Sequence, residues 1–179
     1  MGAHIALLRG INVGGKNRLP MADLKALFEG AGCTAVRSYI QSGNVVFEAT
    51  DDLAARIPTL IPEAIERHHG ISSPVVTRSA EELAAVVEGN PYLAQGAEPK
   101  ALHVAYLADV PDAARLAGLD PDRSPGDTFT AVGREIFLHC PNGLARTKLT
   151  NAWFDSKLGT VSTVRNWKTT GKLLQMAGM

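Results

Sequence analysis

Two pairs of segments repeat along this chain, and the repeat constrains its fold more than any other feature. His4–Leu8 and His103–Leu107 read HIALL and HVAYL, and both runs are apolar enough to be buried strands. Gly43–Phe47 and Gly133–Phe137 resemble each other as well, each at the place of a hairpin. We therefore predict that one structural unit occurs twice.

The first half of the chain alternates strand and helix patterns in one order. Apolar residues at helical spacing follow Pro20, which suits a first helical turn, and Gly32 suits the residue after the helix. Short apolar runs on either side of the segment 41–44 indicate a hairpin. The expected elements are strand 4–8, helix 20–31, strands 36–40 and 45–47, helix 51–69 and strand 74–78. Their order is βαββαβ, which is the ferredoxin-like unit.

The helix expected over 51–69 contains two prolines. Asp51 and Asp52 can cap its start, and Gly70 can end it. Pro58 and Pro62 lack the backbone N–H that a helix interior uses, so we expect this helix to be irregular or split.

The second half begins after a break in the pattern. Ser79 and Glu82 form a capping box that opens a helix to about Glu88, and the stretch 90–99 reads as a linker. The elements expected beyond it are strand 103–107, helix 111–119, strand 133–137, helix 146–158, a β-like run 160–164 and a terminal helix from Trp167.

These elements predict an α+β fold in which duplicated ferredoxin-like βαββαβ halves pack as one compact unit with a C-terminal helix. We expect a single domain over 1–179, with pseudo-repeats at about 1–78 and 100–165 and a linker region at about 79–99. The length of 179 residues is suitable for a single domain.

The longest connection inside the first half is rich in glycine and cations. It runs from Arg9 to Leu19, whereas the second half uses only about 108–110 at the equivalent place. Glycines let backbone N–H groups approach a ligand, and the helix start that follows adds partial positive charge. Since the fold needs only a short connection at this place, the long connection of the first half indicates a functional segment, and its composition indicates an anion site.

This connection nearly spells a Walker A sequence. Gly10, Gly15 and Lys16 match the pattern, but Asn17 stands where a Ser or Thr would hold magnesium. The helix also begins several residues too late, so we reject a nucleoside-triphosphatase. A plain glycine-rich turn with solvated cations stays open as the alternative to an anion site.

Two further clusters carry polar side chains. Residues 39–44 present Gln41, Ser42 and Asn44, which either read a ligand or only form a tight turn. Residues 165–170 begin with Arg165 and Asn166, where Asn166 can cap the last helix. Arg165 either binds an anion or is a surface charge.

Composition restricts the function class. Lys plus Arg and Asp plus Glu both total 18, so general binding to nucleic acid is not favoured. The two cysteines are too few for a secreted disulfide scaffold. We find no targeting pattern and no span of about 18 apolar residues, so we expect a cytoplasmic protein without membrane segments. The sequence has no paired carboxylates near these clusters and no metal-ligand spacing. Whether the protein catalyses a reaction, which cofactor it uses and which oligomeric state it adopts stay open.

Three of these segments resemble a bacterial family catalogued as domain of unknown function 1697. They are LLRGINVGGKN (7–17), YIQSGNVVF (39–47) and the terminal RNW (165–167). The resemblance implies an α+β fold of two similar, intertwined halves and no assigned activity. The chain differs from the family's pattern at residues 146–149, where it has RTKL in the region in which the family often has a Ser-Lys-Leu run.

Our leading hypothesis is a cytosolic protein that binds a small phosphate- or carboxylate-bearing metabolite or nucleotide, or acts weakly on it. The alternatives are an RNA-binding module, because ferredoxin-like sheets commonly present bases to aromatic side chains, and a structural or assembly protein without a ligand. The candidate ligand-binding residues are Arg9, Gly10, Asn12, Gly14, Gly15, Lys16, Asn17, Arg18, Gln41, Ser42, Asn44, Arg165 and Asn166.

Overall fold

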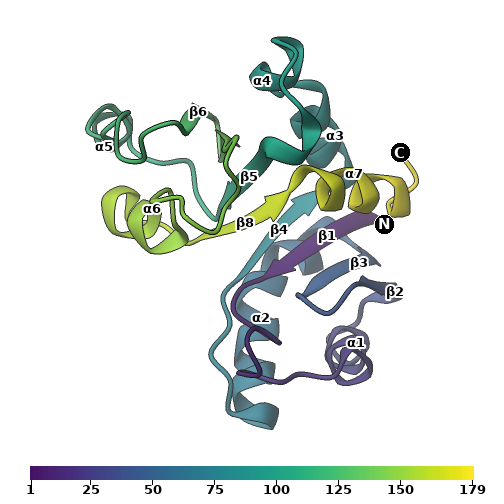
Figure 1. Ribbon diagram of the computed structural model, residues 1–179. Coiled ribbons are helices and arrows are strands. Elements are labelled where there is room, and N and C mark those ends of the chain that lie inside the picture. The colour runs from purple at the N-terminus through teal and green to yellow at the C-terminus, as the bar shows by residue number, and fades with distance from the viewer. The chain divides into compact units, whose positions relative to one another are not determined.

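The first sheet is built around strand β1, and the computed structural model describes all residues from 1 to 179. The strand order is β2-β3-β1-β4, and every neighbouring pair is antiparallel (Figure 1). Ile5 lies opposite Val46 on one side and Arg78 on the other. The four strands are β1 (Gly2–Leu8), β2 (Thr34–Tyr39), β3 (Asn44–Ala49) and β4 (Val75–Ser79).

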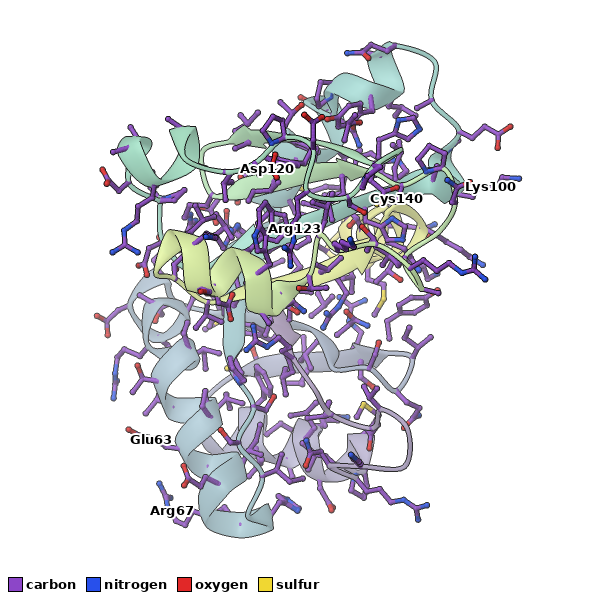
Figure 2. All side chains as sticks on the ribbon, turned by 60° about the vertical axis from the view of Figure 1, so that its left-hand side comes forward. Glu63, Arg67, Lys100, Asp120, Arg123 and Cys140 are labelled. Carbon is purple, nitrogen blue, oxygen red and sulfur yellow. The ribbon has the colours of Figure 1, made fainter.

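Two helices, α1 (Met21–Gly30) and α2 (Asp51–His69), pack against this sheet and share its hydrophobic core. Phe28 of α1 meets Phe47 of β3 with ring centroids 5.3 Å apart. The buried face of α2 carries isoleucines at helical spacing, and its outer face carries Glu63 and Arg67 (Figure 2).

Helix α2 corrects two expectations. It is one continuous helix through Pro58 and Pro62, not a split one, because each proline removes only one N–H while Ile57, Ile61 and Ile65 stay packed in the core. Its N-cap is Thr50, whose hydroxyl accepts from the Leu53 N–H at 3.2 Å. Asp51 and Asp52 therefore occupy the first turn, where their charge favours the helix dipole.

The second sheet has the order β6-β7-β5-β8, which is the same as the first when the strands are counted from the start of each half. Strand β6 was not among the expected elements, and it pairs with β7 in the predicted hairpin. The strands are β5 (Leu102–Leu107), β6 (Thr128–Val132), β7 (Glu135–His139) and β8 (Ser162–Asn166).

Helices α5 (Ala113–Ala117) and α6 (Asn151–Leu158) accompany the second sheet. Trp153 and Phe154 of α6 join the core beside Phe129 of β6. Both helices are shorter than the sequence pattern predicts. Helix α6 begins at 151 and not at 146, because Thr150 is its N-cap and accepts from the Trp153 N–H at 3.2 Å.

The segment expected to be a linker contains short helices. The capping box of Ser79 and Glu82 is confirmed by reciprocal hydrogen bonds of 2.8 and 3.1 Å, and it opens helix α3 (Ala80–Glu88). Helix α4 (Pro91–Ala94) then follows Asn90, whose side chain caps it, and the 3₁₀ helix η1 (Pro99–Ala101) leads into β5. Helix α7 (Trp167–Met176) begins at Trp167, as predicted.

The chain is therefore a mixed α+β protein with two similar halves, and it groups into two compact units. One unit is Met1–Ala84 with Lys172–Met179, and the other is Ala85–Gly171. None of the helices has both the length and the apolar character needed to span a bilayer.

Candidate functional site

In the first unit, the glycine-rich loop after β1 lies against the turn between β2 and β3. Because β1 pairs with β3, the end of β1 reaches this turn, and the Leu8 N–H donates to the Gly43 carbonyl at 2.9 Å. The loop is also fixed from the other side. The Arg9 N–H donates to the Pro74 carbonyl at 3.1 Å, and Ser73 donates to the Arg9 carbonyl at 2.8 Å.

Asn12 closes the loop and joins it to the turn. Its side-chain amide donates to the Leu19 carbonyl at 2.9 Å and to the Gln41 carbonyl at 2.8 Å. Its side-chain oxygen accepts from the Leu19 N–H at 2.8 Å. The backbone of Asn12 has φ +53°, a left-handed conformation that asparagine tolerates better than most residues.

Asn17 and the two glycines shape the tip of the loop. Asn17 has φ +52° and donates from its amide to the Gly10 carbonyl at 2.8 Å. Gly14 and Gly15 have φ +58° and +74°, and the Lys16 N–H closes the turn on the Val13 carbonyl at 2.9 Å. Positive φ at both central residues is the requirement of a type I′ turn, which glycine meets without strain.

The adjoining turn depends on Gly43 and Asn44. A Cβ on Gly43 would lie 2.7 Å from the Leu8 Cβ and 3.0 Å from the Ile11 Cδ1, so only glycine fits there. Asn44 is fully buried, and its amide donates to the Tyr39 carbonyl at 3.2 Å and to the Ser42 hydroxyl at 3.1 Å. The amides of Asn12, Asn17 and Asn44 are thus engaged within the protein, because a loop with many left-handed residues needs side chains to satisfy its carbonyls.

An open hollow of about 390 Å³ lies between the loop and the turn. Arg18, which lines it, and Lys16, in the adjoining loop, are exposed, and neither is in an ion pair. Helix α1 starts at the same place after Pro20 without a side-chain cap, although Asp23 adds a negative charge in its first turn. The residues that line the hollow are Asn12, Gly15, Arg18, Leu19, Pro20 and Gln41.

The remaining predicted residues, Arg165 and Asn166, belong to the second unit. The Arg165 guanidinium donates to the Thr163 hydroxyl at 2.8 Å and to the Val164 carbonyl at 3.1 Å. Burial lowers the pKa of Arg165 to about 10, an effect that Tyr106 opposes. Asn166 accepts from the Thr169 N–H at 2.8 Å, which confirms it as the cap of α7.

Sequence reasoning missed Leu19 and Pro20 as lining residues. Both directly follow Arg18, and the pattern places Leu19 at the end of the connection and Pro20 in the first helical turn. Leu19 is fully buried in the core of the first unit, and Asn12 binds both its backbone N–H and its carbonyl.

The polar side chains that line the hollow are one guanidinium and two amides. Guanidinium, ammonium and backbone N–H groups recognise phosphate or carboxylate oxygens. The cysteines offer no nucleophile, because burial raises the pKa of Cys33 and of Cys140 to about 11 and keeps both thiols protonated near neutral pH. No three His, Cys, Asp or Glu side chains gather as metal ligands.

Comparison with known proteins gives a family and a fold. A family model described as "Protein of unknown function (DUF1697)" matches residues 1–137. Among solved structures, the chain is similar to the conserved bacterial protein SP0830 from Streptococcus pneumoniae, with 24% sequence identity and a TM-score of 0.77 over 100% of this chain and 99% of that chain. No curated protein matches the chain.

Proposed function

The chain belongs to the DUF1697 family, whose description assigns no activity, and on that premise we propose that it binds a small phosphate- or carboxylate-bearing ligand in the hollow between residues 9–19 and 40–43. The observation that carries the proposal is Arg18 lining a preformed hollow beside an uncapped helix start. Arg18 would supply a planar pair of donors, and Lys16 would add charge from the adjoining turn.

The internal hydrogen bonds support this proposal by making the site rigid before a ligand arrives. The three hydrogen bonds of Asn12 hold both walls of the hollow, so little conformational entropy is lost on binding. The role of the asparagines in the proposal is therefore positioning. The direct ligand contacts fall to Gly15, Arg18 and Gln41, with Lys16 beside them.

The same repeated order of elements supports a second inference about the fold. We infer that the two halves derive from one duplicated ferredoxin-like unit, since both sheets combine the same βαββαβ order with the same strand arrangement. In this view the long loop is an addition to the first copy, as its second-half counterpart, 108–112, is much shorter.

The test is isothermal titration calorimetry of the purified chain with inorganic phosphate, pyrophosphate and succinate. We expect at least one to bind, and Arg18→Ala and Lys16→Ala to weaken that binding by about tenfold each. Arg56→Ala is the matched control, because Arg56 is an exposed arginine on α2 outside the hollow. Unchanged melting temperatures would show that the variants remain folded.

Binding that is equally strong in wild type and in Arg18→Ala contradicts the proposed site. An absence of heat with all three probes contradicts the ligand class.

A further inference from the structure

A second pocket, of about 440 Å³, lies within the unit Ala85–Gly171 and shares no residue with the hollow described above. It forms where η1, β5 and the start of α7 meet. Strand pairing explains this convergence, because His103 of β5 lies opposite Asn166, the last residue of β8. The pocket is lined by Pro99, Lys100, His103, Asn166, Trp167 and Lys168.

His103 is the unusual member of this pocket. Its side chain belongs to a residue only 7% exposed, and its Nδ1 has no hydrogen-bond partner. Burial lowers the pKa of His103, an effect that a hydrogen bond with the Ala101 backbone opposes, and it favours the neutral imidazole, which carries one acceptor nitrogen. A buried polar atom without a partner costs free energy, which a ligand hydroxyl or N–H would recover.

Two lysines and the N-terminus of α7 lie at this pocket. Lys168 is exposed in the first turn of α7, a helix of ten residues whose N-terminus carries partial positive charge. Lys100 projects at the edge of the ribbon (Figure 2). Its Nζ lies 3.3 Å from Glu98, but both side chains are largely exposed, and such surface pairs contribute little. An anion can therefore compete with Glu98 for Lys100.

Trp167 and Asn166 complete the walls. The half-buried indole of Trp167 offers an aromatic surface for a planar ring. The Asn166 oxygen is used in capping the Thr169 N–H, so its remaining polar capacity is the amide NH₂. The pocket thus combines cations, an aromatic side chain and a buried imidazole, within the volume range usual for small-molecule sites.

We propose that this pocket binds a nucleoside monophosphate. The phosphate lies between Lys100, Lys168 and the N-terminus of α7, the base lies against Trp167, and a hydroxyl or N–H of the ligand donates to the His103 imidazole. This site is independent of the proposed anion site at the loop, since the two have no residue in common.

The first experiment titrates the whole chain with adenosine 5′-monophosphate and monitors binding by calorimetry and by tryptophan fluorescence. Adenosine and inorganic phosphate are titrated separately, and we expect both to bind more weakly than the monophosphate. Lys168→Ala and Lys100→Ala should each weaken binding by about tenfold. The control Lys157→Ala, an exposed lysine in the last turn of α6, should bind as wild type does.

Fluorescence gives a second readout because the chain has only two tryptophans. Trp153 lies in the hydrophobic core of the second unit, so ligand-dependent quenching should come from Trp167 and vanish in Trp167→Phe. The lysine variants keep the test decisive if Trp167→Phe fails to fold, because both lysines are exposed.

The proposal is overturned by no binding of the monophosphate at millimolar concentration, by equal binding by wild type and Lys168→Ala, or by binding of phosphate alone as tight as that of the nucleotide. Loss of nucleotide binding in Arg18→Ala with retention in both lysine variants also overturns it and moves the ligand to the loop.

Discussion

The side-chain amide of Asn12 donates a 2.8 Å hydrogen bond to the backbone carbonyl of Gln41, a residue that lies on the neighbouring turn. This one contact joins the loop after β1 to the connection between β2 and β3. It explains how two polar segments that are separate in sequence form one hollow.

Replacing Asn12 should destabilise the first unit. Asn12→Gly keeps the freedom for φ +53° but removes three hydrogen bonds, one of them to the buried Leu19 N–H, so we expect a loss of about 2–3 kcal/mol in the free energy of unfolding. Urea denaturation measures it. Asn17→Gly is the control, since it removes one hydrogen bond and should cost about 1 kcal/mol. Equal losses would contradict the role of Asn12.

Gly43 should be the least replaceable glycine of the loop region. Gly43→Ala places a methyl group 2.7 Å from the Leu8 Cβ at φ +87°, so we expect a loss of about 2–4 kcal/mol. Gly10→Ala provides the comparison, because its φ is +77° but nothing lies within 4 Å of the added Cβ. That variant should lose only about 1 kcal/mol. Thermal denaturation of both variants measures the two losses, and an equal loss in Gly43→Ala and Gly10→Ala would contradict the steric role of Gly43.

Stability should fall on alkaline titration because of the buried thiols. Burial raises the pKa of Cys33 and Cys140 from 9.0 to about 11, so above pH 9 the unfolded chain releases thiol protons that the folded chain keeps. The free energy of unfolding therefore decreases as the pH rises, by up to about 1 kcal/mol per thiol and pH unit.

Arg165 acts in the opposite direction as the pH nears and passes 10, where the folded protein loses a proton that the unfolded chain retains, so its effect is smaller than that of the thiols between pH 9 and 10. The window from pH 9 to 10 is thus the informative one. Urea denaturation at these two pH values, in wild type and in the double variant Cys33→Ala/Cys140→Ala, should show a shallower pH dependence in the variant. The same slope in both proteins would refute this assignment.

Asn166 allows capping to be separated from ligand binding. Asn166→Ala removes the acceptor for the Thr169 N–H and should cost about 1 kcal/mol of stability. Asn166→Asp keeps an acceptor and should preserve the melting temperature, yet it places a negative charge in the second pocket and should weaken nucleotide binding. Melting temperatures and calorimetric titrations of both variants would separate the two roles. A loss of both stability and nucleotide binding in Asn166→Asp would argue against this separation.

Local signals were reliable where a few neighbouring residues decide the outcome. The capping box at Ser79 and Glu82 and the cap at Asn166 formed as expected, because each involves hydrogen bonds within one helical turn. Strand β6 was missed, since Thr128–Val132 has only half-buried and exposed side chains and little apolar contrast. The continuity of α2 through its prolines also escaped prediction, because packing of its buried isoleucines outweighs the lost hydrogen bonds.

The amino-acid sequence by itself determined the order of most strands and helices, the family and the two segments that form the hollow. Periodicity, caps and glycine positions are local properties and are readable without coordinates. Only the tertiary structure decided what the polar residues do. It assigned the amides of Asn12 and Asn44 to the backbone and left Arg18 lining the hollow. It also placed His103 beside Trp167. Hydrogen-bond partners distant in sequence depend on strand pairing, which brings together residues that no local pattern connects.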